Sequence, residues 1–388
     1  MPSIPSSALS RWDPCRTSSS PRSCDHGSSK RWRPRFAMLP TDRPGMDGSG
    51  STRSERSASR RDVARIRQWL LGLFLDGLTR MAERIPIDRA VGIGGAFGRA
   101  WFRLGGPRTA LVREQLRAAF PDADEGQREV WARGVFDQLG MGLAEWLLLR
   151  GRHREALLDR VRIEGLEHVE GILRADPSRG AMIVTGHLGN WELACAKIAA
   201  SGIPVSLVYR DLDRPILDRL LLETRGSSPI GDRPSEDVGT LESIPMGRAG
   251  LRVARALREG RAVLALIDQN ARRNEGLFVS FFGRPASTRP GPLVLAARLE
   301  VPVLFATMRR APDRRSHHLS FEKPLDLEVG TIGSDDGEAL LRRNLQRVTR
   351  RLERAIRAEP SQWIWTHRRW RTRPVSGKRV EGGVEEAG

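Results

Sequence analysis

One short stretch of the sequence combines residue types that carry out acid–base chemistry. Residues 185–192 read Thr-Gly-His-Leu-Gly-Asn-Trp-Glu, which places His187 between two glycines and five residues before Glu192. A histidine can take a proton from a hydroxyl nucleophile, and a neighbouring carboxylate can orient the ring and stabilise its protonated form. The glycines let the backbone approach a substrate closely. The pattern therefore predicts a general base, His187, assisted by Glu192.

The elements around this stretch would place it at the end of a strand. Residues 181–185 form a short apolar run that predicts a strand, and residues 191–200 predict a helix with Asn190 as its N-cap. Ligands of open α/β sheets bind beyond the carboxyl ends of strands. Free N–H groups at a helix start suit a phosphate or a developing oxyanion, so we assign Asn190 to substrate binding. The alternative is an ordinary strand-to-helix turn with a solvated glutamate, but the two glycines and the strand end favour function.

Three more polar loops are expected at the same edge of the sheet. Arg210 follows a predicted strand that ends at Tyr209, Asp268 follows a second strand, and the pair at 309–310 follows a third. Arginine clamps a phosphate or carboxylate through paired hydrogen bonds, and Asp268 would position Arg210 or a substrate hydroxyl. Each loop alone is compatible with a surface ion pair. Their convergence favours a substrate site that includes Arg210 and Asp268.

Strand and helix patterns alternate from residue 176 to residue 308. Besides those named above, we expect strands at 204–209, 262–267 and 302–308, and helices at 213–226, 248–259 and 293–299. This alternation indicates an α/β fold with a largely parallel central sheet flanked by helices. An alternating segment at 318–322 predicts an edge strand, and a long arginine-rich helix is expected at 337–358.

The remaining chain divides by composition. Residues 1–60 are rich in Ser, Pro and Arg, which predicts a disordered extension. A translation start assigned too far upstream would add an extension of this kind. Residues 61–150 predict a helical, membrane-associated region, 151–375 the α/β catalytic domain, and 376–388 a flexible tail. No run reaches the ~20 apolar residues that a membrane span requires. The helices of 61–150 are therefore either a core-facing pair or a monotopic anchor with tryptophans at the lipid interface.

The overall charge narrows the classes of partner. The chain has 65 Lys and Arg against 47 Asp and Glu, a formal net charge of +18. Such a charge fits nucleic acid, an anionic membrane surface, or an acidic protein or phosphorylated substrate. Three cysteines cannot form a disulfide framework, which favours a reducing compartment.

Several common kinds of site are missing from the sequence. It has no zinc-ligand spacing, no phosphate-binding or dinucleotide-binding glycine motif and no Gly-x-Ser-x-Gly. We therefore expect no metal or nucleotide cofactor. The Trp- and Arg-rich segment 363–373 would be a stacking platform for nucleic acid, a membrane-interface segment, or a surface element packed through its tryptophans.

Taken together and in order, these motifs resemble the bacterial lipid A biosynthesis acyltransferases, the late lauroyl/myristoyl enzymes of the wider lysophospholipid/glycerolipid acyltransferase-like group. The resemblance covers residues 110–374. The matching pieces are Gly186–Ala194, Tyr209-Arg210, the helix 247–260, the strand ending in Asp268-Gln269, Phe281-Phe282-Gly283 and Pro360–Pro374. The histidine box alone is shared by glycerolipid acyltransferases generally, whereas the ordered set is specific.

The resemblance implies transfer of a fatty acyl chain from acyl-carrier protein, or acyl-CoA, to a hydroxyl of a lipid A precursor or related glycolipid at the cytoplasmic face of the inner membrane. It implies His187 as base with Glu192 as partner, without a cofactor. Arg210 and Asp268 match further active-site positions, which would bind phosphate or support charge on the thioester oxygen.

Three alternatives to this acceptor and this activity stay open. Relatives with the same box acylate lysophospholipids or phosphatidylinositol mannosides, and the block after Asp268, Gln-Asn-Ala-Arg-Arg-Asn, is richer in arginine than the family pattern. A basic nucleic-acid-binding protein is the non-enzymatic alternative and predicts steeply salt-dependent binding. The ordered motifs favour the enzyme without a nucleic-acid partner, and the segment 363–373 then fits a membrane interface better than nucleic acid.

Overall fold

The computed structural model describes residues 70–209, 215–225, 241–246, 249–328, 330 and 335–375. All of them belong to one compact unit, residues 58–388. The extension 1–60, the tail 376–388 and the candidate Arg210 lie outside the described residues.

A seven-stranded sheet forms the centre of this unit, with the strands in the order β1-β9-β8-β2-β5-β3-β4. The strands are β1 (Val161–Glu164), β2 (Ala181–Thr185), β3 (Val205–Tyr209), β4 (Leu241–Pro245), β5 (Ala262–Leu266), β8 (Val303–Arg310) and β9 (His317–Phe321). Every neighbouring pair is parallel except β8 and β9. The expected α/β fold with a largely parallel sheet is confirmed.

The segment expected as an edge strand occupies a different place. β9 lies between β1 and β8, and β1 forms the edge. Its alternating burial arises because one of its faces is covered. Alternation reports the covering of a face and says nothing about which strands lie on either side.

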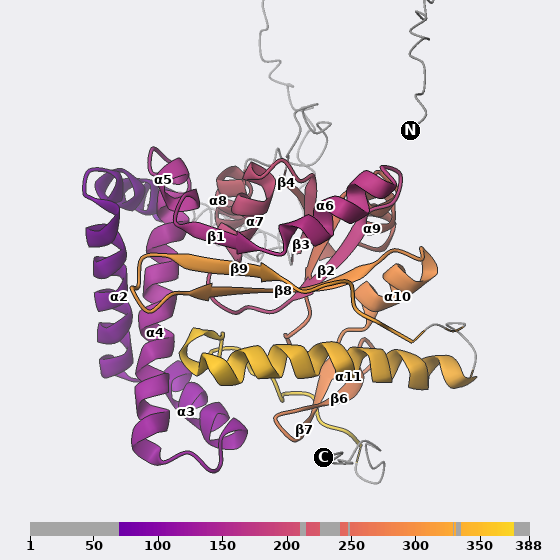
Figure 1. Ribbon diagram of the computed structural model, residues 1–388. Helices are drawn as coiled ribbons and strands as arrows, with labels where there is room; N and C mark the ends of the chain where they lie inside the picture. Colours follow the sequence, from indigo (N-terminus) through magenta and orange to yellow (C-terminus); the bar gives the residue numbers. More distant parts are fainter. Residues whose placement is uncertain are drawn as a thin grey trace, which may run out of the picture. The chain divides into compact units, whose positions relative to one another are not determined.

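Helices cover both faces of the sheet (Figure 1). They are α2 (Ile87–Leu104), α3 (Pro107–Ala119), α4 (Glu125–Leu148), α5 (Arg154–Leu158), α6 (Leu166–Ala175), α7 (Trp191–Ala200), α8 (Pro215–Arg225), α9 (Ala249–Arg258), α10 (Gly291–Arg298) and α11 (Asp335–Ala358). Successive residues of β2 point to opposite faces, so Met182 and Val184 join a core with α10 and α11, and Ala181 and Ile183 join a second core with α6 and α7. Burial on both faces explains why β2 reads as an unbroken apolar run.

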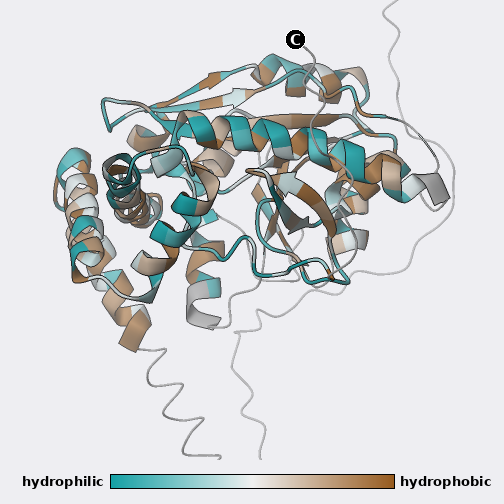
Figure 2. Cartoon of the chain, turned by 90° about the horizontal axis from the view of Figure 1, so that it is seen from below, coloured by the Kyte–Doolittle hydropathy of each residue, from teal (hydrophilic) through white to brown (hydrophobic). Residues whose placement is uncertain are grey.

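Four strands escaped the sequence patterns. β1 and β4 are short edge strands of the sheet, and β6 (Leu277–Phe281) and β7 (Arg284–Thr288) form a separate antiparallel hairpin. The hairpin packs against the apolar side of α11. The residues of α11 outside this core are mostly hydrophilic (Figure 2).

The N-terminal helices form part of the same unit. Glycines of α2 and α4 let the two backbones meet, since a Cβ at Gly98 would collide with the carbonyl of Phe136 and one at Gly140 with the carbonyl of Gly94. Within the described part of the chain, no helix has both the length and the apolar character needed to cross a membrane.

Candidate active site

His187 lies at the carboxyl edge of the central sheet, two residues beyond the end of β2. The turn after it depends on Gly189, which has a φ of +63°, and a Cβ there would collide with the Met308 carbonyl of β8. Only glycine adopts this conformation in so confined a place at low cost. The sequence analysis assigned Gly189 to the close approach of a substrate, but in the structure this glycine allows the close approach of β8.

Asp268 is the side chain that meets the imidazole. Thr185 and Leu266 are opposite each other in the parallel pair β2–β5, so residues 187 and 268 emerge at the same level. His187 donates from Nδ1 to Asp268 Oδ1 at 2.6 Å and from its backbone N–H to Oδ2, also at 2.6 Å. The Asp268 side chain is 0% exposed and that of His187 14%.

The carboxylate of Asp268 fixes the tautomer of the neutral imidazole. Burial alone would raise the pKa of this carboxyl, but the positive charge that His187 carries when protonated, together with hydrogen bonds from its ring, its backbone N–H and the Trp363 indole, lowers the pKa to about 2. An ionised carboxylate only accepts hydrogen bonds, so in the neutral ring Nδ1 carries the proton and Nε2 holds the lone pair. Nε2 accepts a hydrogen bond from the Gln269 side-chain nitrogen at 3.1 Å. A group that takes the place of this amide would therefore meet the lone pair of Nε2.

Glu192 does not orient the imidazole, and this corrects the pairing expected from the sequence. Its two carboxylate oxygens accept hydrogen bonds from Nε and Nη2 of Arg225 at 2.9 and 2.7 Å, and Oε1 also accepts from the Trp191 indole at 3.1 Å. The guanidinium of Arg225 at the end of α8 is buried, and a buried cation requires a paired anion. The ring of Trp191, not the carboxylate, contacts the ring of His187 at 4.7 Å between centroids.

Asp268 itself was assigned to substrate on the basis of the sequence. Its carboxylate is fully enclosed, and Oδ2 also accepts a hydrogen bond from the Trp363 indole at 2.7 Å. The structure therefore places Asp268 behind His187, where it contacts the base and has no open side for a ligand.

Asn190 is the N-cap of α7, as expected, and both of its polar atoms are used inside the protein. Its side-chain oxygen accepts from the Leu193 N–H at 3.1 Å, and its nitrogen donates to Glu145 Oε2 at 2.9 Å. A capping side chain with both atoms engaged fixes the start of α7 relative to α4. A role for Asn190 in substrate binding stays a prediction.

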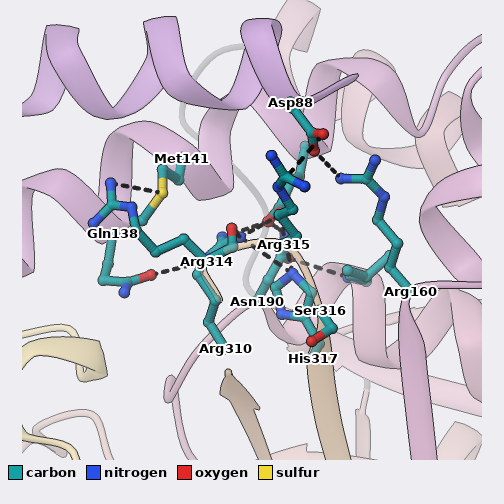
Figure 3. A network of polar contacts seen from close by, with 12 residues as sticks. Asp88, Gln138, Met141, Arg160, Asn190, Arg310, Arg314, Arg315, Ser316 and His317 are labelled. Carbon is teal, nitrogen blue, oxygen red and sulfur yellow. Dashed lines mark hydrogen bonds and ion pairs between the residues drawn. The ribbon is translucent and has the colours of Figure 1, made fainter. Parts of the chain in front are cut away.

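Glu145 is the centre of a buried ionic network, and Figure 3 labels its partners Asn190, Arg310 and His317. Arg310 donates to both of its oxygens at 2.6 and 2.7 Å, and His317 Nε2 lies 2.9 Å from Oε1. Burial would raise the pKa of Glu145, but the hydrogen bond from His317 and the charge of Arg310 lower it to about 2. Arg310 was expected in a substrate loop and instead lies inside this network at the end of β8. The sequence signal for this network was Glu145, a lone glutamate within the apolar run of α4.

The residues 360–373, called here the closing segment, complete the site from the far end of the chain. Gln362 accepts from the Gly189 N–H through its carbonyl, and Ile364 donates its N–H to the carbonyl of His187 at 3.2 Å. Trp363 and Trp365 are 1% and 0% exposed, with their indoles bonded to Asp268 and to the Pro360 carbonyl. These tryptophans are core residues, so the interpretation of the segment as a membrane interface is wrong for them.

An apolar cleft of about 260 Å³ opens beside His187 and is called the apolar cleft below. Residues of α4, among them Leu139, Gly142, Leu143 and Trp146, form one wall, and the loop from His187 to Glu192 forms the other. The described residues contain no group of three or more His, Cys, Asp or Glu side chains arranged to hold a metal ion. The arrangement thus places an imidazole that is hydrogen-bonded to a buried carboxylate in the wall of an apolar space.

A family model and the curated relatives identify one family. Residues 56–372 match the model of the family described as bacterial lipid A biosynthesis acyltransferase. The chain is 28% identical over 275 residues to the lipid A biosynthesis palmitoleoyltransferase of Escherichia coli K12, covering 69% of this chain and 80% of that protein. It is 25% identical over 309 residues to the lipid A biosynthesis lauroyltransferase of the same organism, covering 79% and 93%. A crystal structure of a 1-acyl-sn-glycerophosphate (LPA) acyltransferase from Thermotoga maritima aligns with a TM-score of 0.32 and 14% identity over 78% of this chain and 99% of that one.

Proposed function

The chain belongs to the bacterial lipid A biosynthesis acyltransferase family and is an acyltransferase, and from this premise we propose that it moves a fatty acyl chain from the thioester of acyl-carrier protein to a hydroxyl of a lipid A precursor or a related glycolipid. The observation that carries the proposal is the Asp268–His187 pair, with His187 among the residues that line the apolar cleft. An acyl-CoA donor would use the same pair.

The proton follows a simple path in this reaction. His187 Nε2 removes the proton of the acceptor hydroxyl as that oxygen forms a bond to the thioester carbonyl carbon. The tetrahedral intermediate then expels the thiolate as the C–S bond breaks, and the imidazolium returns the proton to sulfur. Asp268 stabilises the imidazolium through the 2.6 Å hydrogen bond at Nδ1 and keeps the ring in its productive tautomer.

The other residues act by position. Trp191 packs against the imidazole, and the Glu192–Arg225 pair anchors the first turn of α7, so the ring has one orientation. The apolar cleft suits a hydrocarbon chain, whose burial contributes about 0.8 kcal/mol per CH₂. The acyl chain would therefore lie along α4 with its thioester at His187.

Membrane attachment would use exposed apolar residues on the N-terminal helices. Ile93, Phe97, Trp101 and Leu104 form one exposed stripe along α2, at spacings of four, four and three residues. The helix over 70–83 also exposes apolar side chains, and Figure 2 shows hydrophobic residues at the end where the described chain begins. We place this surface against the cytoplasmic face of the inner membrane, in a peripheral or monotopic mode, with arginines facing anionic head groups.

The attachment can be measured with anionic phospholipid vesicles. Phe97→Glu should reduce the fraction of protein that sediments with vesicles, because it places a charge in the middle of the stripe. Leu251→Glu is the matched control, since Leu251 is an apolar residue on α9 that is 88% exposed, against 64% for Phe97. Equal binding by both variants and the parent would contradict attachment through α2.

Acyl transfer is tested by mass spectrometry of total lipids from cells that overproduce the protein or its His187→Ala variant. A lipid that is heavier by one acyl group, present with the parent and absent with the variant, is the expected result and identifies acceptor and chain length. A lysophospholipid or mannoside product would replace the proposed acceptor. An unchanged product with a folded His187→Ala protein would refute the mechanism.

A further inference from the structure

A second concavity, of about 1140 Å³, is lined by residues that follow Asp268, by the closing segment and by the start of α3. Arginines line it from two directions, and it is called the arginine cavity below. They are Arg272, Arg273 and Arg289 around the β6–β7 hairpin, Arg368, Arg371 and Arg373 of the closing segment, and Arg108 at the start of α3.

The positive charge of this cavity is largely uncompensated. No Asp or Glu is among its lining residues, and within the described part of the chain Arg108, Arg273 and the three arginines of the closing segment form no ion pair with a carboxylate. Glu275 pairs only with Arg289, at 2.7 Å, and with Arg272, at 3.9 Å. Crowded cations repel one another, so an arrangement of this kind is stabilised when an anion binds.

The arginine cavity adjoins the catalytic base. Asn270 lines it, and the preceding residue, Gln269, reaches Nε2 of His187. The Asn270 N–H donates to Nε2 of His367 at 2.9 Å, and its side chain is bonded to Thr372 in both directions at 3.0 Å. These bonds join the loop that follows Asp268 to the closing segment, so the wall of the cavity is fixed relative to His187.

We propose that the arginine cavity binds the phosphorylated head group of the lipid acceptor and thereby brings the acceptor hydroxyl to His187. Guanidinium groups bind phosphate through paired, charge-assisted hydrogen bonds, and a concave site with cations on two sides encloses a head group. The acyl donor has a separate apolar cleft along α4. Arg272 and Arg273 line this cavity and would thus help to select an acceptor with phosphate.

This inference rests on the proposed function. A binding measurement distinguishes a failure of the inference from a failure of the proposed function. In the His187→Ala background, calorimetry would measure binding of a phosphorylated lipid A precursor in detergent micelles, and of the same lipid after phosphatase treatment. Arg272→Gln/Arg273→Gln and, in the closing segment, Arg371→Gln/Arg373→Gln should each weaken binding of the phosphorylated lipid by about tenfold or more. Neither should change binding of the dephosphorylated lipid.

Arg162→Gln/Arg174→Gln is the matched control, because these arginines are 73% and 78% exposed on β1 and α6 and line neither site. Equal loss with control and cavity variants, or equal loss for both lipids, would overturn the proposal. Phosphate-dependent binding without any acyl transfer by the parent would support the cavity and refute the proposed function.

Kinetics with the parent background separate the acceptor from the donor. The cavity variants should raise KM for the phosphorylated acceptor and leave kcat and the KM for the acyl-carrier donor unchanged. A rise in the donor KM alone would assign the arginines to the acidic carrier protein and overturn the proposal.

Discussion

Replacing Asp268 by asparagine should abolish the basicity of His187 while leaving the protein folded. Three donors converge on the two carboxylate oxygens: Nδ1 of His187 on Oδ1, and the His187 N–H and the Trp363 indole on Oδ2. An amide offers one oxygen, and the backbone and indole N–H groups can only donate. The amide oxygen therefore takes the place of Oδ2, and the amide NH₂ faces Nδ1.

This geometry sets the size of the effect. An NH₂ group opposite Nδ1 requires Nδ1 to accept, so the ring proton moves to Nε2 and the nitrogen that faces the acceptor loses its lone pair. General base catalysis contributes roughly 10²–10⁴ in rate, and the tautomer change removes all of it. We expect kcat to fall by about 10³-fold, or about 4 kcal/mol in the barrier, with KM for the acceptor nearly unchanged.

The assay is steady-state acyl transfer from a carrier-bound donor, with folding checked by circular dichroism. Asp176→Asn, in an exposed turn where the carboxylate caps Ser178, is the matched control and should keep full activity. A kcat for Asp268→Asn within tenfold of the parent would refute the reasoning. A loss of 10³-fold in a folded Glu192→Gln variant, with Asp268→Asn active, would restore Glu192 as the partner of the base.

The remaining predictions concern stability and chain length. Glu192→Gln should lower the free energy of unfolding by about 3–5 kcal/mol because it leaves the Arg225 charge buried and unpaired, and Glu192→Leu/Arg225→Met should recover most of it in urea titrations. Gly142→Met should shift the acyl products toward shorter chains by mass spectrometry, because a side chain at Gly142 meets open space within the apolar cleft, whereas Gly171→Met on α6 should not. The pKa of Asp268 is about 2, against an ordinary 3.8. This depression contributes roughly 2 kcal/mol to the free energy of unfolding above pH 4, and the contribution is lost as the pH falls through 2. The stability difference between the parent and Asp268→Asn should therefore shrink by roughly 2 kcal/mol in acid titrations.

The sequence predicted those features that depend on local pattern. The apolar run of β2, the cap at Asn190 and the helix that follows it are set by residues within one turn or one strand, and the structure has each of them. The position of Asp268 beyond a strand end was also correct, since it follows from the length of one apolar run. Its register against β2 was not available from that run.

The wrong assignments share a physical cause. Glu192 lies close to His187 in sequence, and proximity suggested a pair, but the burial of Arg225 decided where the carboxylate is needed. Arg225 is 33 residues away along the chain. Burial of a charge imposes a stronger requirement than nearness of a base, because an unpaired buried ion costs more than a hydrogen bond returns.

The closing segment extends the same argument to the tryptophans. Tryptophan beside arginine is typical of a membrane interface because both side chains combine an apolar body with a polar end. At Trp363 the polar end is used inside the protein, on the Asp268 carboxylate that is also bonded to His187, 95 residues earlier in the chain. Mixed Trp and Arg composition therefore cannot separate a lipid-facing segment from a buried core segment. The stripe on α2 differs because its apolar side chains are exposed in the structure, and the proposed membrane attachment is therefore argued from exposure and not from composition.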